Sequence, residues 1–346
     1  MIKIGINGFG RIGRAIYRIN HIKKLFDIVV INDINPDIKN ICYTLQFDTT
    51  YGRFNDSISH NENQIYVGSK TIDVFNHESI TDVPWDDYGV DIVIDSSGIS
   101  KNLDLILNVP SNVKHFILTN APQGFSEIKT VIFGVNDNEI NPDVQRVYSS
   151  SICDTIALSP IIKLIKETHA IESGFLTTLH PWLSYQNLLD GPSASWSQPG
   201  DVFSHYALGR ASTENLIPKS TSAIVAADLV FPGISNIIQS FSYRTPTKIV
   251  SSAVLILLLD REIIIDDLKE RFYRYQKNQK IKVFHNNVEP LTSLDYTGEE
   301  YSAIIDHRWI KVANKRHLKI VYWYDNEWGY SNRVIDLVNR ISRHYR

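Results

Sequence analysis

The chain has 346 residues, a length that favours about two domains over a single hydrophobic core. Its 35 Lys and Arg nearly balance 38 Asp and Glu, and no dense basic stretch is interleaved with aromatic residues, so a nucleic-acid partner is not expected. The longest apolar run, residues 249–259, contains Ser251 and Ser252 and is far shorter than the roughly 20 residues that span a bilayer. It predicts a buried strand, and no membrane contact is expected.

Two general expectations follow from the chain start and the cysteines. The first strand begins within the first few residues and leaves no segment with the pattern of a signal peptide, so we expect a cytoplasmic protein. Cys42 and Cys153 are the only cysteines, and their spacing predicts neither a disulfide framework nor a zinc motif. No bound metal is therefore expected.

A glycine-rich turn follows the first apolar strand, residues 2–6. Gly8, Gly10 and Gly13 have the spacing of a dinucleotide-binding turn, and Asp33 ends the next apolar run twenty positions later. Such glycines allow a tight turn, a close approach of a pyrophosphate and close helix packing, while the carboxylate accepts hydrogen bonds from ribose hydroxyls. A glycine-rich turn alone is weak evidence, but with a strand before and a helix after it predicts NAD rather than NADP. The expected contacts in this turn are Gly8, Gly10, Arg11, Ile12 and Gly13.

The first 150 residues alternate short apolar strands with helical segments, which predicts a parallel doubly wound sheet of the Rossmann type. Residues 90–98 and 115–120 are two such strands, and each ends in small polar residues. Ligands bind at the carboxyl edge of these sheets, so Ser97 and Thr119 are candidate cofactor contacts. Ordinary turn residues would have the same pattern.

Beyond about residue 170 the pattern changes to longer strands, including residues 174–180 and 253–259, with more aromatic residues. This favours a second domain with a mainly antiparallel sheet. Residues 183–218 are rich in Ser, Gly and Pro and predict a long functional or interfacial loop. The end of the chain, residues 331–343, regains a helical period, with its apolar face formed by Val334, Leu337, Val338 and Ile341.

Cys153 lies between a strand-like segment and the start of an apolar helical pattern. The positive end of a helix stabilises a thiolate, although an isolated cysteine is more often an inert buried thiol. His180 ends the strand at residues 174–180, and a thiol that attacks an aldehyde needs such a base nearby.

Six motifs occur in order along the chain, at residues 6–14, 31–33, 176–180, 214–218, 244–247 and 323–331. Through these motifs the whole chain resembles the glyceraldehyde-3-phosphate dehydrogenase family, of which erythrose-4-phosphate dehydrogenase is a close relative. The resemblance implies an α/β protein with two domains: an NAD-binding Rossmann domain at residues 1–152, completed by the C-terminal helix 326–346, and an α+β catalytic domain at residues 153–325.

The resemblance also implies roles for individual residues. Cys153 would be the nucleophile and His180 the base, while Asn326 and Tyr330 would hold the nicotinamide. Thiohemiacetal formation, hydride transfer to NAD and cleavage of a thioester by phosphate or water would follow, in a homotetramer. The substrate would be a small phosphorylated aldehyde, contacted by Asp154, Thr155, Arg210, Thr221 and Arg244.

The chain departs from the family at its phosphate-binding positions. The family usually has Ser-Cys-Thr-Thr-Asn around its nucleophile, whereas this chain has Ile152 before Cys153 and Asp154 after it. An additional carboxylate repels an attacking phosphate and opposes formation of a thiolate. The alternative interpretation is that Asp154 only starts the helix. Trp182 and Leu183 replace further hydroxyl-bearing residues, Ser222 stands where glycine is usual, and the loop at residues 192–214 is longer, with the extra residues around 194–200.

Three alternatives remain open from the sequence. The first is an NAD-dependent dehydrogenase of glyceraldehyde 3-phosphate. The second is a divergent paralogue that oxidises another aldehyde, such as erythrose 4-phosphate, and hydrolyses the thioester, as the residues around Cys153 suggest. The third is a non-catalytic regulatory protein that binds NAD, against which the retention of Cys153 and His180 argues.

Overall fold

A computed structural model describes residues 2–108, 111–122, 124–125, 127–193 and 205–345. The chain forms two compact units. The first contains residues 1–131, 139–150 and 331–346, and the second contains residues 132–138 and 151–330. Each unit is built around its own sheet.

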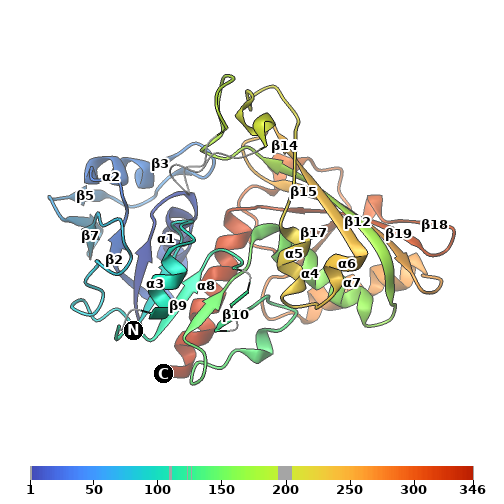
Figure 1. Cartoon of the computed structure of the whole chain (residues 1–346), viewed down its shortest axis with the longest axis horizontal. Coiled ribbons are helices and arrows are strands. Elements are labelled where there is room, and N and C mark those ends of the chain that lie inside the picture. Colours follow the sequence, from blue (N-terminus) through green and yellow to red (C-terminus); the bar gives the residue numbers. More distant parts are fainter. Residues whose placement is uncertain (1, 109–110, 123, 126, 194–204, 346) are drawn as a thin grey trace. The chain divides into compact units, whose positions relative to one another are not determined.

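The first unit is built on a nine-stranded sheet in the order β10-β11-β9-β8-β1-β2-β7-β6-β5. All neighbours from β10 to β7 pair in parallel, and the last three strands form antiparallel hairpins (Figure 1). Its elements are β1 (Lys3–Asn7), α1 (Arg11–Lys23), β2 (Asp27–Asn32), α2 (Ile38–Gln46), β3 (Phe47–Asp48), β4 (Gly52–Arg53), β5 (Ile58–His60), β6 (Gln64–Val67), β7 (Lys70–Phe75), β8 (Ile92–Asp95), α3 (Asn102–Asn108), β9 (His115–Leu118), β10 (Ile128–Thr130), β11 (Val147–Ser149) and most of α8 (Trp328–Ser342).

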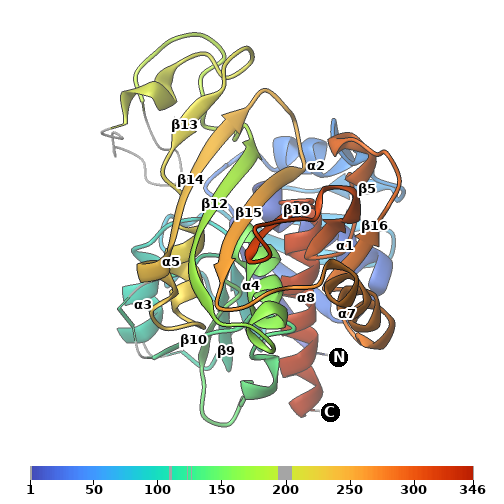
Figure 2. The same ribbon diagram turned by 90° about the vertical axis from the view of Figure 1, so that its right-hand side faces the viewer.

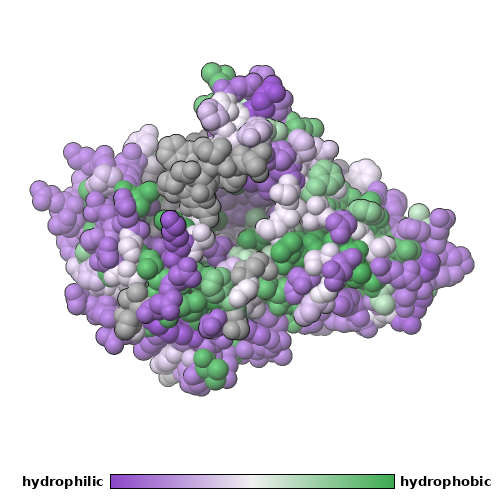
Figure 3. All heavy atoms as spheres, in the orientation of Figure 1, coloured by the Kyte–Doolittle hydropathy of each residue, from purple (hydrophilic) through white to green (hydrophobic). Residues whose placement is uncertain are grey.

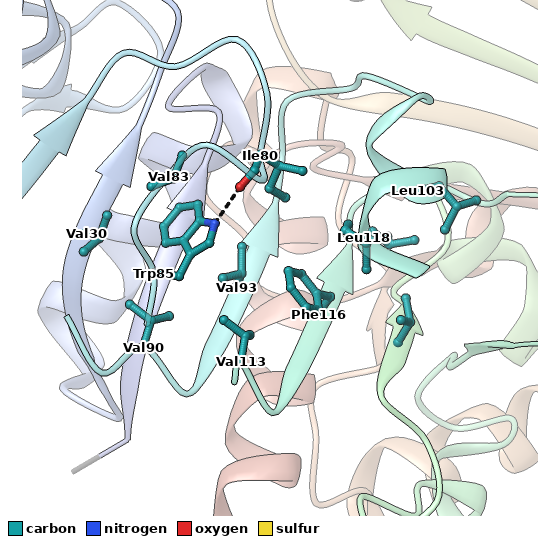
Figure 4. Close-up of a cluster of buried hydrophobic side chains, with 12 residues drawn as sticks. Val30, Ile80, Val83, Trp85, Val90, Val93, Leu103, Val113, Phe116 and Leu118 are labelled. Carbon is teal, nitrogen blue, oxygen red and sulfur yellow. Dashed lines mark hydrogen bonds between the residues drawn. The ribbon is translucent and has the colours of Figure 1, made fainter. Parts of the chain in front are cut away.

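A hydrophobic cluster lies between this sheet and the segments that cover it. Trp85 packs among Val30, Val93 and Phe116, and its indole N–H donates to the carbonyl of Ile80 at 2.8 Å (Figure 4). A buried indole is tolerated because its polar end has found an acceptor. The cluster closes one face of the parallel sheet.

The second unit is built on an eight-stranded mixed sheet, β13-β14-β12-β15-β19-β17-β16, with β18 pairing with β19. The central neighbours β12, β15 and β19 are antiparallel, whereas β12 pairs with β14 in parallel. Figure 2 shows β14, β12 and β15 at the front with α4 behind them. The elements are α4 (Cys153–Lys166), β12 (Ile171–Pro181), β13 (Ile217–Lys219), α5 (Ala223–Asp228), α6 (Ile234–Ile237), β14 (Ile238–Thr245), β15 (Ser251–Leu259), α7 (Ile265–Asn278), β16 (Phe284–Asn287), β17 (Ala303–Asp306), β18 (Lys311–Ala313) and β19 (His317–Tyr324), with short 3-10 turns at Asp137–Glu139, Tyr206–Gly209, Ser293–Tyr296, His307–Trp309 and, in the first unit, Arg343–Tyr345.

The predicted fold class is confirmed: a mostly parallel sheet is followed by a mixed, mostly antiparallel one. The predicted apolar face of the last helix is buried throughout, at Val334, Leu337, Val338 and Ile341. The run at residues 249–259 is only partly a buried strand, because alternate side chains of β15 face away from the core and Ile256 is 41% exposed. The residues predicted to lengthen the loop, 194–200, lie outside the described residues. Within the described parts of the chain, none of the helices has the length and hydropathy needed to span a membrane.

Candidate active site

The glycine turn of the first unit has the backbone that the sequence predicts. Gly8 has a φ of +88°, and a Cβ there would lie 2.5 Å from the Ser97 backbone, so no other residue fits without strain. A Cβ on Gly13 would collide with the carbonyl oxygen of Gly8. The Asp33 carboxylate accepts the Phe9 backbone N–H at 2.6 Å and so fixes the turn against the end of β2.

The turn leads into a helix end suited to an anion. Gly10 is the N-cap of α1 and has no side chain to cap it, the first turn contains no acidic residue, and no heavy atom lies within 4 Å of the position of a Cβ on Gly10. Arg11 and Ile12 are the first helical residues, and the Arg11 guanidinium lies 2.5 Å from Asp48. The positive end of α1 and the open space at Gly10 fit the pyrophosphate of a dinucleotide.

The other two predicted contacts of the first unit make structural hydrogen bonds. The Ser97 hydroxyl donates to buried Asp95 at 2.7 Å, and the Thr119 hydroxyl donates to the Asp95 backbone carbonyl at 3.1 Å. Burial raises the pKa of Asp95, although Ser97, Asn7 and Asn102 all donate to its carboxylate. This network ties together the carboxyl ends of β1, β8 and β9, where a cofactor is expected.

In the second unit, the structure brings Cys153 and His180 together. Cys153 is the first residue of α4, and His180 lies near the end of β12, with 3.8 Å between the Cys153 Sγ and the His180 Nε2. Ser151, just before the helix, has a left-handed φ of +60°, and the Tyr330 hydroxyl donates to its carbonyl at 2.9 Å. Tyr330 therefore supports the turn that presents the thiol.

The tautomer of His180 follows from its second hydrogen bond. The His180 Nδ1 lies 2.8 Å from the Pro181 carbonyl oxygen, which only accepts, so Nδ1 carries the proton and Nε2 faces the sulfur with its lone pair. Burial lowers the pKa of His180 to about 4, and the positive charge of Arg244 adds to this effect. The imidazole is thus a neutral base at pH 7.

Asp154 is buried beside the thiol. One carboxylate oxygen accepts the Tyr324 hydroxyl at 2.6 Å and lies 3.6 Å from the Cys153 Sγ, while the other accepts the Thr221 hydroxyl at 3.2 Å. Burial raises the pKa of Cys153 well above its usual value, and the charge of Asp154 raises it further. The expected stabilisation of a thiolate by the helix end is outweighed, because desolvation and a carboxylate both favour the neutral thiol.

Two cations face this cluster. Arg244 on β14 is 6% exposed, and its guanidinium donates to the Tyr185 hydroxyl at 3.2 Å. Its Nε has no hydrogen-bond partner among the described residues. Lys219, at the end of β13, has its pKa lowered to about 8 by burial and by Arg244. A buried cation with an unused donor fits an anionic substrate group.

Not every predicted residue joins the cluster. Thr155 is fully buried, and its hydroxyl donates to the Ala223 carbonyl at 2.9 Å, which connects α4 to α5. Arg210 is exposed and pairs with Asp190 at 2.8 Å, and no described contact connects it to Cys153. Asn326 is buried, and its side-chain oxygen has no hydrogen-bond partner among the described residues, which fits a donor such as a carboxamide N–H₂.

Sequence reasoning missed Lys219 and Tyr324. Lys219 lies two residues before Thr221, and Tyr324 lies within the motif at residues 323–331, but neither position indicates a contact with Asp154 or Cys153. Only the pairing of strands far apart in the sequence brings them there.

Comparison with known proteins agrees with this site. Residues 2–103 match the model of the glyceraldehyde 3-phosphate dehydrogenase NAD-binding domain, and residues 152–326 match that of its C-terminal domain. The chain belongs to the glyceraldehyde-3-phosphate dehydrogenase family. It is 36% identical to glyceraldehyde-3-phosphate dehydrogenase 1 of Bacillus cereus over 97% of both chains. It is also 33% identical to the cytosolic enzyme of Gracilaria gracilis, over 99% of this chain and 98% of that one, and 34% identical to the enzyme of Streptomyces coelicolor, over 97% of both.

Membership of this family identifies NAD as the cofactor, in agreement with the prediction. The observations on the first unit fit that group: the open helix end at Gly10 and the turn held by Asp33.

Proposed function

We propose that this protein is an NAD-dependent glyceraldehyde-3-phosphate dehydrogenase that works through a thiohemiacetal and a thioester on Cys153. The observation that carries the proposal is the 3.8 Å approach of the His180 Nε2 to the Cys153 Sγ, with the other ring nitrogen held by a carbonyl. The relatives, which match over nearly their whole length, are named as this enzyme. These names favour triose phosphate over the other aldehydes and over a non-catalytic role.

Cys153 and His180 supply the covalent and acid–base chemistry. As the Cys153 sulfur bonds to the aldehyde carbon, its proton passes to the His180 Nε2 and from there to the new alkoxide, which gives a neutral thiohemiacetal. The same nitrogen then takes the hydroxyl proton as the carbon loses its hydride and becomes a thioester carbonyl. A neutral imidazole suits both steps, because it can accept a proton at pH 7.

NAD supplies the hydride acceptor when it is bound. We assign its contacts to the glycine turn and helix end, with Asp33, Ser97 and Thr119 at the strand ends. Ser97 and Thr119 also hold the side chain and the backbone of Asp95 in place. Asn326 would accept a hydrogen bond from the carboxamide, and Tyr330 would hold the turn before Cys153. The contacts in the turn are Gly8, Gly10, Arg11, Ile12 and Gly13.

Arg244 and Lys219 would bind the phosphate of the substrate. Both are cations whose burial is costly without an anion, and Arg244 retains an unused donor. Thr221 would contribute less than its place in the motif suggests, because its hydroxyl is given to Asp154. We assign Thr155 to the support of α4, and Arg210 to its pair with Asp190.

We also propose a cytoplasmic homotetramer with an NAD-binding domain at residues 1–152 and 326–346 and a catalytic domain at residues 153–325. The matched ranges support this division, and one relative is named as cytosolic. Association is supported by an exposed apolar sheet face, on which Phe175 lies directly opposite Ile256 and Phe241 opposite Thr177. Figure 3 shows further hydrophobic surface around α5 and α6, where Val225 is 47% exposed.

The test is formation of NADH from glyceraldehyde 3-phosphate and NAD, with and without inorganic phosphate, using Cys153→Ala as the blank. Turnover that requires phosphate supports the proposal. Turnover of another aldehyde without phosphate would support the hydrolysing paralogue instead. Absence of turnover with every aldehyde, together with tight NAD binding, would favour the regulatory protein.

A further inference from the structure

Asp154, which the dehydrogenase chemistry does not use, converges with Cys153 and His180 in the second unit. The Cys153 Sγ, one Asp154 oxygen and one His180 nitrogen all lie within 4.8 Å of one another. The sulfur lies 3.6 Å from the Asp154 oxygen and 3.8 Å from the His180 Nε2. In a tetrahedral zinc site with bonds of about 2.3 Å to sulfur and about 2.0–2.2 Å to nitrogen and oxygen, both separations would be about 3.6 Å. The two separations from sulfur already fit such a site, whereas the Asp154 oxygen and the His180 nitrogen, which lie within 4.8 Å of each other, would have to close to about 3.4 Å.

The groups behind these ligands hold them in the form that a metal requires. The His180 Nδ1–H donates to the Pro181 carbonyl, which leaves Nε2 unprotonated toward the cluster. The Asp154 carboxylate accepts the Tyr324 and Thr221 hydroxyls, which fixes its orientation. A carbonyl behind a histidine ligand and donors behind a carboxylate ligand are the usual supports of protein metal sites.

We propose that Cys153, Asp154 and His180 form a three-ligand binding site for Zn²⁺, with the fourth position left for water. On binding, the Cys153 S–H bond breaks, the proton leaves to solvent and a Zn–S bond forms, with no change of oxidation state. The mixture of one thiolate, one imidazole and one carboxylate suits Zn²⁺ better than Ca²⁺ or Mg²⁺, which prefer oxygen ligands. Asp154 is the residue that distinguishes this chain, because the family usually has threonine there.

The surrounding charges set the strength of the site. The thiolate and the carboxylate together offset the two charges of the ion, whereas Arg244 and Lys219 oppose its entry. The site is therefore expected to bind zinc reversibly rather than permanently. If the proposed function is correct, occupied ligands cannot act as nucleophile and base, so zinc would inhibit the enzyme until a chelator removes it.

The experiment measures metal binding directly, without NAD or substrate. Tag-free, reduced protein is titrated with Co²⁺, followed by a thiolate-to-cobalt absorption band, and Zn²⁺ is then added in competition. We expect one equivalent per chain, with displacement of cobalt by zinc and full reversal by a chelator. Cys42→Ser is the matched cysteine control, because Cys42 is buried in the first unit with its pKa raised to about 11 by burial, and it should leave the titration unchanged.

Two substitutions test the ligand set. Asp154→Asn keeps the shape of the side chain but removes its charge, and we expect at least a tenfold loss of zinc affinity. Tyr324→Phe retains all three ligands and should weaken binding about tenfold through the loss of a supporting hydrogen bond. Tyr322→Phe is its matched control and should have no effect, because the Tyr322 hydroxyl has no hydrogen-bond partner among the described residues.

An affinity of Asp154→Asn within twofold of the unchanged protein would overturn the proposal, as would a cobalt complex without the thiolate band. Thermal unfolding of each metal-free variant shows whether it is folded. If Asp154→Asn does not fold, His180→Asn removes another ligand and should cause the same loss of zinc affinity. Since binding is read without turnover, zinc binding by a catalytically inactive protein would leave this inference standing and reject only the proposed function.

Discussion

Replacement of Asp154 by asparagine should make Cys153 more reactive. The carboxylate oxygen lies 3.6 Å from the sulfur, and its charge opposes formation of the thiolate. The amide occupies the same volume and can still accept the Tyr324 hydroxyl, so the change removes a charge with little repacking. The thiolate population at pH 7 should therefore rise.

The magnitude follows from this separation. Two unit charges about 4 Å apart repel by roughly 4 kcal/mol at an effective dielectric constant of about 20. Partial exposure of Cys153 and the nearby charge of Arg244 screen this repulsion, so we retain about a third to a half of it. Since about 1.4 kcal/mol corresponds to a tenfold change in the thiolate population, the expected increase is roughly 10- to 30-fold.

The assay is the rate of alkylation by iodoacetamide between pH 6 and 9, in buffer with a chelator. Tyr324→Phe is the control for a disturbed hydrogen bond at Asp154, and it should not accelerate the reaction, since the charge of Asp154 remains. Cys153→Ser should abolish the part of the alkylation that is assigned to Cys153. An alkylation rate of Asp154→Asn equal to or below that of the unchanged protein would refute the electrostatic argument.

Four other substitutions have defined outcomes. Asp154→Thr should lower the KM for inorganic phosphate at least tenfold in steady-state assays, and an unchanged KM would mean that the carboxylate does not oppose the acceptor. Burial alone would raise the pKa of Asp306, but hydrogen bonds from the Arg308 guanidinium and the Trp323 indole outweigh burial and lower the pKa. The ionised carboxylate therefore stabilises the fold above about pH 4, and this stabilisation is lost as the pH falls through the folded-state pKa. Asp306→Asn should thus lower Tm by a few degrees at pH 7 and by less at pH 3, and a constant difference would contradict this. Gly8→Ala should lower the free energy of unfolding, measured with denaturant, by about 2 kcal/mol or more. Gly10→Ala should change that free energy by less than about 0.5 kcal/mol but weaken NAD binding in a direct titration. Equal losses of stability in the two variants would contradict the assigned turn.

Several features were predictable from the sequence because they depend on neighbours in the chain. The turn from Gly8 to Gly13 requires small residues at fixed spacing, and Asp33 ends the strand that follows. The buried face of the last helix follows from a period of 3.6 residues. The antiparallel hairpins at residues 58–75 were missed, because short strands at a sheet edge carry weak periodic patterns.

The state of the candidate site depended on tertiary structure. The sequence by itself determined that Cys153, His180 and Asp154 are present and that Asp154 departs from the family. Only the fold decided that Asp154 accepts Tyr324 and Thr221, that Lys219 faces Arg244, and that Thr155 supports a helix. The physical reason is that the ionisation of a group is set by its burial and by charges within a few ångströms, and here those charges come from strands that are distant in the chain.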